Sequence, residues 1–269
     1  MTTTSSQTPK VCLCSGKIML IINAIVILLT FPASAQNPLI QYFYVSQAPT
    51  FPAAGALFEQ SLLSAEFHND FCLKELIYKS LSYDFVKNRN CGFLVLDHFG
   101  YSKYGNFSLS AGYARCFGHK LSISLAGDYL VQHAEHYPSL HSFTIDISGI
   151  LLINNNAGIL ISLYNPIRMH YGVVGQSIIP IQFNIESYYQ IDSKLISYML
   201  CKKTLPGNLE IGGGLNCYPT KHLYVNIFCS QIKIGAGAAT QWKHFILGTS
   251  ANWNYKLGIS TQSHLNYLF

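Results

Sequence analysis

Charged side chains are scarce in this chain. Asp, Glu, Lys and Arg make up 11% of its 269 residues, whereas typical globular chains carry roughly 25%. Aromatic residues reach 13% and apolar residues 49%. A water-soluble protein usually covers its surface with Lys and Glu, so something else must cover this one. The composition therefore favours a protein whose outer surface meets lipid.

Long apolar runs are scarce as well. One run covers residues 18–31, and no stretch long enough to span a bilayer follows it, since a spanning helix needs about 20 apolar residues. This argues against a helical membrane protein. The net charge of +5 is dispersed, and no basic cluster is longer than Lys202-Lys203. The electrostatic footprint of a nucleic-acid-binding protein is therefore missing, and we expect no nucleic-acid partner.

No familiar catalytic or cofactor motif stands after residue 35. The sequence has no G-x-S-x-G elbow, P-loop, H-E-x-x-H or dinucleotide-binding G-x-G-x-x-G. His133, Glu135, His136 and His141 form the one cluster that resembles a metal site, and a surface hairpin is the preferred interpretation. We therefore predict no enzyme, no metal site and no cofactor. A rim-located hydrolase with a Ser–His pair is a weaker alternative.

The first 35 residues have the pattern of a cleavable signal peptide. Two lysines and no acidic residue precede the apolar run, and the small-x-small sequence Ala33-Ser34-Ala35 follows it. Cleavage is predicted between Ala35 and Gln36, with an uncleaved N-terminal anchor as the alternative. The predicted organisation is a signal peptide over 1–35, a short mature segment over 36–57 and a barrel over 58–269.

Six cysteines follow the leader, with wide spacings and no C-x-x-C pair. An exported protein can form disulfides, but fifteen connectivities are open and the sequence does not choose among them. We therefore prefer to interpret the cysteines as small apolar residues on strands. The six are Cys72, Cys91, Cys116, Cys201, Cys217 and Cys229.

From about Phe58 to the end, apolar and polar residues alternate with a period of two, which is the pattern of β-strands. Residues 143–148 (FTIDIS) and 181–186 (IQFNIE) alternate perfectly. Turn-rich joints such as 87–90 (KNRN) and 154–156 (NNN) separate these segments. The joint spacing predicts about 14 strands, within a range of about 12–14, each near the 9–11 residues of a tilted transmembrane strand.

The polar face of these strands consists mainly of Ser, Thr, Asn, Gln and Gly, with isolated acids such as Asp146, Glu186 and Glu210. A soluble β-sandwich, the architectural alternative, usually places Lys and Glu on this face. Small neutral groups suit the lumen of a membrane barrel, and only a closed sheet pairs every backbone group in lipid. We predict an all-β protein with a closed antiparallel transmembrane β-barrel in contact with outer-membrane lipid.

The C-terminal strand ends on an aromatic residue. Phe269 is the last residue, and Tyr267 and Leu265 share its face. This pattern resembles the signal that the barrel-assembly machinery reads in bacterial outer-membrane proteins. Leu265, Tyr267 and Phe269 are therefore the predicted C-terminal insertion signature, and that machinery is a predicted partner during biogenesis.

The middle of the chain resembles a family of exported barrels. Residues 99–104 (FGYSKY) and 112–118 (GYARCFG) are similar to the "GY…Y…GYAR.FG" passage of the PorV/PorQ relatives of the long-chain fatty-acid transporter (FadL-like) barrels. Residues 128–139 resemble the family's "DYL…AEGYGS" hairpin, and 164–168 (YNPIR) its "FNP.R" strand end. The order of these motifs matches from about residue 58 to 269.

The resemblance implies an outer-membrane barrel of a gram-negative bacterium that transports a small hydrophobic ligand. In PorV-like members it implies instead a structural role alongside the type IX secretion system, with loops that bind a partner protein. Pro138 replaces a flexible glycine of the family's hairpin, and the N-terminal segment is shorter than the lumen-filling hatch of fatty-acid transporters.

Overall fold

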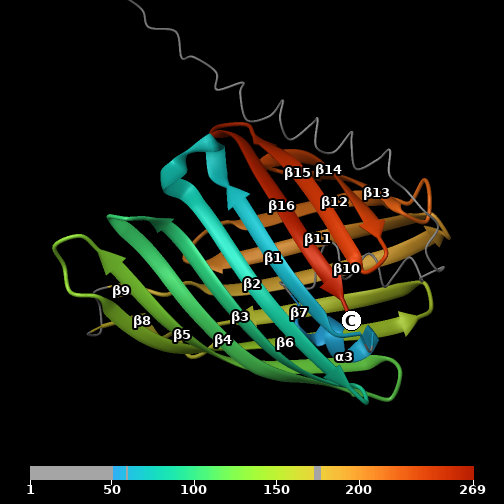
Figure 1. Cartoon of the computed structure of the whole chain (residues 1–269), viewed down its shortest axis with the longest axis horizontal. Coiled ribbons are helices and arrows are strands. Elements are labelled where there is room, and N and C mark those ends of the chain that lie inside the picture. Colours follow the sequence, from blue (N-terminus) through green and yellow to red (C-terminus); the bar gives the residue numbers. More distant parts are fainter. Residues whose placement is uncertain (1–50, 59, 173–176) are drawn as a thin grey trace, which may run out of the picture. The chain divides into compact units, whose positions relative to one another are not determined.

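Fourteen antiparallel strands close into one barrel in the computed structural model, which describes residues 51–58, 60–172 and 177–269 (Figure 1). The predicted fold class and strand number are confirmed. No helix in the described part of the chain is long and apolar enough to cross a membrane. The predicted cleavage site at Ala35 and Gln36 lies outside the described residues.

Consecutive barrel strands pair as hairpins, with a small extra hairpin, β8 (His170–Tyr171) and β9 (Ser177–Ile178), between β7 and β10. A short helix, α3 (Ala53–Phe58), precedes the first strand. The barrel strands are β1 (Leu62–Asn69), β2 (Ile77–Lys87), β3 (Asn90–Tyr101), β4 (Tyr104–Phe117), β5 (Leu121–Ala134), β6 (Leu140–Asn154), β7 (Ala157–Tyr164), β10 (Ile181–Asp192), β11 (Leu195–Leu205), β12 (Leu209–Cys217), β13 (Leu223–Ser230), β14 (Lys233–Trp242), β15 (Phe245–Asn254) and β16 (Gly258–Leu268).

The first and last strands close the barrel. β1 pairs with β16 from Leu62 opposite Leu268 to Asn69 opposite Thr261. Inside the barrel, the Ser64 hydroxyl donates to Asn266 Oδ1 at 2.6 Å, so side chains add to the ladder of the closing pair. Closure pairs the first and last strands with each other, so neither is left with the free edge that is unfavourable in lipid.

The antiparallel order gives the barrel two different ends. The end that holds the start of β1 and the finish of β16, called here the turn end, carries connections of two to five residues, such as 88–89 and 218–222. The opposite end, called the loop end, carries the two longest connections, 70–76 and 165–180. Short turns at one end and longer loops at the other are typical of outer-membrane barrels.

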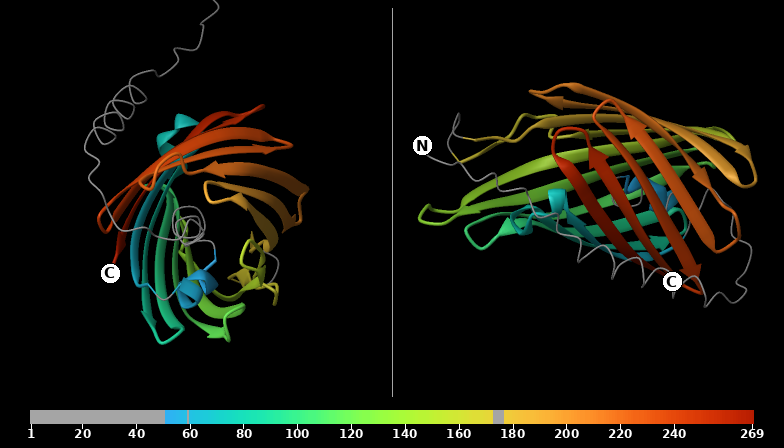
Figure 2. Two further views of the ribbon diagram at one scale, coloured as in Figure 1. Left: turned by 90° about the vertical axis from the view of Figure 1, so that its right-hand side faces the viewer. Right: turned by 90° about the horizontal axis from the view of Figure 1, so that it is seen from above.

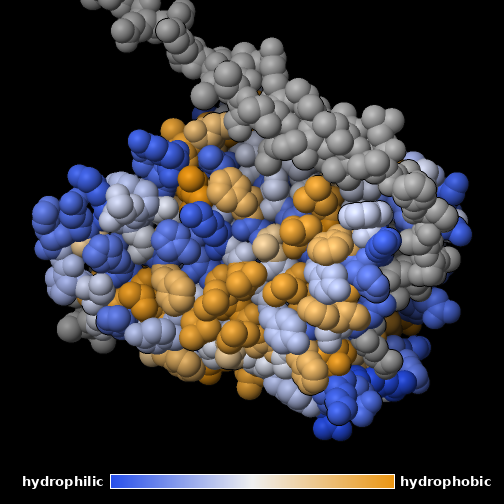
Figure 3. Space-filling model, viewed as in Figure 1, coloured by the Kyte–Doolittle hydropathy of each residue, from blue (hydrophilic) through white to orange (hydrophobic). Residues whose placement is uncertain are grey.

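Apolar side chains cover the outer face of the barrel. Leu125, Met199 and Ile227 are 56%, 65% and 56% exposed, whereas their inward neighbours, such as Ser124 at 3%, are buried. Figure 3 shows apolar side chains gathered across the middle of the visible face, with hydrophilic residues toward its ends. An apolar surface of this extent is suited to lipid rather than water.

The predicted C-terminal signature residues lie on this outer face. Leu265 is 44% and Phe269 62% exposed. Tyr267 is the strand partner of Phe245, which faces outward. The centroid of the Tyr267 ring lies 4.8 Å from that of Phe245 and 4.8 Å from that of Phe269. The three side chains form one apolar strip at the turn end, as the alternation predicts. Their role in insertion stays a prediction.

All six cysteines in the described residues are free thiols. Cys91 and Cys116 are buried among apolar side chains on the inner face of β3 and β4, near α3. For Cys91 and Cys116 this agrees with the interpretation as small apolar residues on strands, whereas Cys72 lies exposed in a short 3-10 helix, η2 (Asp70–Cys72), outside the strands.

The two faces of β11 allow a test of the membrane-facing surface. We expect Met199→Arg, in the outward middle of the strand, to lower the free energy of unfolding by about 2–4 kcal/mol, because it places a guanidinium in hydrocarbon. The adjacent Leu200→Arg points into the lumen and should lower it less. Urea unfolding of the barrel refolded in lipid vesicles measures both values. Equal losses in the two variants would contradict the assignment of the faces.

Candidate functional site

The inner face of the barrel differs between its two halves. Toward the turn end an apolar cluster fills the space between the strands, together with buried polar side chains such as Asp84, Ser122 and Asn216, whereas toward the loop end the inward side chains leave cavities with a largely polar lining. Both sets occupy every second position of their strands, so the period of two is kept while its chemistry changes along the barrel axis. The lumen therefore consists of a filled part and a hollow part.

The filled part, called here the apolar plug, is a cluster of buried side chains from the segment before β1 and from most of the strands. Phe51 is only 1% exposed and lies among side chains that the strands direct inward. The cluster contains Phe51, Ala53, Ala54, Leu62, Ile150, Leu160, Tyr188, Ile196, Tyr218, Tyr224, Ala239, Ile246 and Leu268. Water is excluded from this end of the lumen because apolar groups fill it.

Helix α3 lies against the inner wall beside this plug (Figure 2). The Ser122 hydroxyl of β5 donates to the Ala53 carbonyl at 2.7 Å, and both residues are fully buried. Gly55 faces β3 so closely that an added Cβ would lie 2.8 Å from Cys91 Sγ. A larger residue than glycine therefore does not fit where the helix meets the wall.

The hollow part of the lumen contains two cavities. The large cavity has a volume of about 620 Å³ and the small cavity about 360 Å³. The large one lies on the β3–β7 side, and the small one on the β10–β16 side. Asn184 and Lys202 line both, so the two cavities adjoin at β10 and β11. The large cavity is within the size range of sites for small molecules.

Three carboxylates line the large cavity from three strands: Asp97, Asp128 and Asp146. Asp97 accepts hydrogen bonds from the Tyr78 hydroxyl at 2.8 Å and the Ser108 hydroxyl at 3.1 Å. Asp128 Oδ2 and Asp146 Oδ1 have no hydrogen-bond partner among the described residues. Donors of the described residues therefore satisfy this group of acidic side chains only in part.

Apolar and aromatic groups share the lining with these acids. Phe93, Val95 and Phe99 come from β3, and Tyr171 comes from the β8–β9 hairpin outside the barrel ladder. Burial raises the pKa of Tyr171, so its hydroxyl stays neutral at physiological pH. A cavity lined by both apolar surface and a few polar groups is typical of ligand sites.

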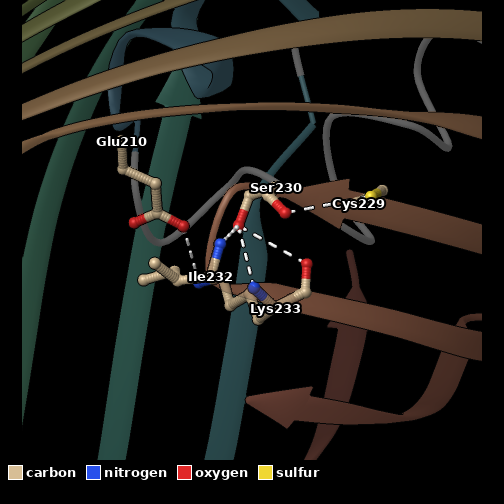
Figure 4. A network of polar contacts seen from close by, with 5 residues as sticks. All are labelled: Glu210, Cys229, Ser230, Ile232 and Lys233. Carbon is tan, nitrogen blue, oxygen red and sulfur yellow. Dashed lines mark hydrogen bonds and ion pairs between the residues drawn. The ribbon is translucent and has the colours of Figure 1, made fainter. Parts of the chain in front are cut away.

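The small cavity carries both signs of charge. Glu186 and Glu210 line it together with Lys202 and Lys233. Lys233 Nζ lies 3.5 Å from Glu210 Oε1, and Figure 4 shows this pair beside the tight β13–β14 turn. The Ser230 hydroxyl accepts from the Lys233 amide at 3.3 Å and holds that turn. The positive charge of the lumen therefore lies on the wall formed by β11 and β14.

Asn165 anchors the connection beyond the short strand β7. Its backbone amide donates to Ile145 on β6, its Oδ1 accepts from the Thr144 hydroxyl at 2.9 Å, and its Nδ2 donates to the Ile179 carbonyl at 2.8 Å. Its φ of 54° is left-handed, a conformation that Asn tolerates better than most residues. These bonds close the wall where the upper part of β6 lacks a partner strand.

The histidine cluster considered in the sequence lies away from the cavities. His133 is near the end of β5, and Glu135 and His136 lie in the exposed β5–β6 turn. His141 stacks on Tyr129 on the outer face, with ring centroids 5.9 Å apart. Among the described residues no group of three or more His, Cys, Asp and Glu side chains is placed to hold a metal ion. The turn is a surface hairpin, as preferred.

Comparisons with known proteins support the architecture. No protein-family model and no curated protein matches the sequence. A deletion mutant of the monoaromatic hydrocarbon channel TodX matches with a TM-score of 0.61 and 8% identity, covering 83% of this chain and 93% of that one. The Ralstonia pickettii toluene transporter TbuX gives 0.59 and 9%, covering 82% and 92%. The channel CymD gives 0.57 and 10%, covering 88% and 95%.

This chain has the fold of these channels. At such low identity the likeness concerns the fold alone. The FadL-like part of the sequence resemblance agrees with it, while the PorV/PorQ assignment stays a prediction.

Sequence reasoning singled out Asp146, Glu186 and Glu210 as isolated acids and missed the gathering of Asp97 and Asp128 beside Asp146. The register brings them together: Asp97 pairs with Ser108, Asp128 with Ser110, and Asp146 with Tyr164. The alternation places each of them inward, but only the pairing places them at neighbouring heights. The alternation along β11 also places Lys202 in the lining of the lumen, whereas the next residue, Lys203, does not line either cavity.

The seat of α3 gives a second testable prediction. We expect Gly55→Leu to displace the helix, because its Cβ would collide with Cys91 while leucine itself favours helices. Amide hydrogen exchange of residues 53–57 should become about tenfold faster or more, as local opening becomes easier. Gly92→Leu is the control, since an added Cβ there meets nothing within 4 Å. Unchanged exchange in Gly55→Leu would show that the seat tolerates a side chain.

Proposed function

We propose that this protein is a plugged channel of the gram-negative outer membrane, non-enzymatic, that carries a small solute with an apolar body. The observation that carries the proposal is the large cavity of about 620 Å³, which lies in the lumen of a closed, lipid-facing barrel. TodX and CymD, monoaromatic hydrocarbon channels, and TbuX, a toluene transporter, share this fold, which is consistent with such a role.

The lining favours a solute that is partly apolar. Phe93, Val95 and Phe99 offer apolar surface, whereas Asn106, Gln182 and Asn184 offer amides for orientation. A purely polar pore would need none of the former. The prediction of a hydrophobic ligand is therefore kept for the main part of the solute. The polar groups of the lining favour a solute that also carries at least one polar group.

The path through the barrel is closed at the turn end by the apolar plug. A solute that enters from the loop end reaches the large cavity first and meets Phe51 and α3 beyond it. Passage therefore requires α3 to leave the wall. The Ser122 hydroxyl holds the helix through its bond of 2.7 Å to the Ala53 carbonyl. Opening breaks this bond, at a cost of about 1–3 kcal/mol, and also exposes the buried side chains of Phe51, Ala54 and Ala56.

The alternative function is a structural barrel that binds a partner protein in a secretion system. It predicts a lumen that is filled throughout. The two cavities favour the channel over this alternative. A serine hydrolase at the rim would need a Ser–His pair such as Ser139 and His133, whose Oγ and Nδ1 lie 3.4 Å apart beside the exposed β5–β6 turn. Neither residue lines one of the two cavities that could hold a substrate in the described part of the chain.

Conductance in planar bilayers tests the channel. We expect the wild-type barrel to conduct poorly and Gly55→Leu to conduct about tenfold more or better, because the displaced helix opens the lumen. Adding Ser110→Trp to Gly55→Leu should lower the current again, since Ser110 lines the large cavity. Ala111→Trp, one residue further on the lipid-facing side, is the matched control and should leave the current unchanged.

Two outcomes would contradict the channel. One is an α3 segment that exchanges fast in Gly55→Leu without any gain in current. The other is an equal effect of Ser110→Trp and Ala111→Trp. Either result would favour the partner-binding barrel instead.

A further inference from the structure

The large cavity has an excess of hydrogen-bond acceptors. Asp128 Oδ2, Asp146 Oδ1, Asn106 Oδ1 and Asn184 Oδ1 line it or lie in its wall, and none of these atoms has a hydrogen-bond partner among the described residues. Asn184 Nδ2 donates to the Ser162 hydroxyl at 3.0 Å, which fixes the direction in which its oxygen points. A wall of acceptors without donors is matched by a ligand that brings N–H or O–H groups.

The charge of the same wall selects between such ligands. Asp128 is only 2% exposed. The Ser110 side chain hydrogen-bonds to it, but its Oδ2 has no partner among the described residues. Asp97 is already bonded by Tyr78 and Ser108. A buried carboxylate is favoured in its ionised form only where a cation compensates it. Among the described residues that line the cavity, Lys202 on β11 is the one lysine, against three carboxyl groups. The lining therefore favours a ligand that brings a positive charge of its own.

The apolar part of the lining favours an organic cation over a metal ion as the ligand. Phe93 and Phe99 lie in the same cavity as the acids, and aromatic faces attract organic ammonium groups. The described residues offer no group of three or more ligands placed for a metal ion. A cation with an apolar body uses both parts of the lining, whereas an inorganic ion uses only one.

We propose that the large cavity binds small amphipathic amines, with the ammonium group held by Asp128 and Asp146 and the apolar body packed against Phe93, Val95 and Phe99. This proposal rests on the channel function and names the class of solute that the channel takes. The ammonium donates its N–H groups to the carboxylates and to Asn184, and charge-assisted bonds of this kind are stronger than neutral ones. Anionic solutes are repelled by the same wall.

The experiment compares three probes that share a phenyl ring: 2-phenylethylammonium, the neutral 2-phenylethanol and the anion phenylacetate. Calorimetric titration into the detergent-solubilised full chain at about 0.1 M salt measures binding, since higher salt screens the interaction. We expect 2-phenylethylammonium to bind about tenfold more tightly than the alcohol. Phenylacetate should bind more weakly than both.

Variants that remove negative charge and a variant that removes positive charge should change amine binding in opposite directions. This distinguishes a loss of amine recognition from misfolding. The double variant Asp128→Asn/Asp146→Asn should weaken 2-phenylethylammonium about tenfold or more and leave 2-phenylethanol nearly unchanged. Lys202→Met removes a positive charge from the lining and should tighten the amine, an effect that a damaged barrel does not produce. Asp192→Asn at the turn end is the control and should change neither probe.

Conductance measured on the same preparations distinguishes the two proposals. Conductance of the Gly55→Leu barrel together with equal binding of amine and alcohol in every variant would overturn the amine site and leave the channel standing. Amine binding that responds to the Asp and Lys variants, in a barrel that never conducts, would keep the site and overturn the channel. Preferential binding of phenylacetate would overturn the charge argument directly.

Discussion

The hydrogen-bonded pairing of β1 with β16 is the interaction on which the rest of the structure depends. Without it the sheet has two free edges, and in lipid every unpaired N–H and C=O is unfavourable by several kcal/mol. The pairing joins residues 62–69 to 261–268, the two ends of the described barrel. Once the ring is closed, the alternation of each strand divides the chain into a lipid-facing set and a lumen set of side chains.

Closure creates an interior that the sequence must then fill. At the turn end the strands supply apolar residues such as Ile150, Ile196 and Ile246, and the chain segment around Phe51 completes the cluster. At the loop end the strands supply Ser, Asn, Asp and Tyr, which leave the two cavities. The barrel is therefore closed at its turn end and hollow at its loop end. The proposed function depends on α3 and Phe51, which lie where the filled part meets the cavities.

Much of the fold was predictable from the residues because its signal is local. The alternating residues 143–148 lie within β6, and the predicted joints at 87–90 and 154–156 contain the turns between β2 and β3 and between β6 and β7. The pairing of β1 with β16 could be inferred only from the requirement that a sheet in lipid has no free edge. The strand count needed no long-range information, since consecutive strands are neighbours.

The site itself was less predictable because it depends on register and on a segment without periodicity. Asp97, Asp128 and Asp146 lie on separate strands, and nothing local in the sequence indicates that they reach one cavity. Residues 53–58 form a single short helix of small residues, AAGALF, too short for an amphipathic pattern. Its place inside the barrel is decided by Gly55 against Cys91 and by the Ser122 bond, both of which are non-local contacts.

The central claim is that this chain is a closed barrel embedded in the outer membrane. The most direct measurement fractionates cells that express it, extracts the outer membrane in mild detergent and compares gel mobility with and without boiling. The account predicts a band in that fraction whose mobility shifts on boiling, because a closed β-sheet resists detergent until heated. A soluble band in the periplasmic fraction with no shift would contradict the barrel in lipid, and with it the channel and the amine site.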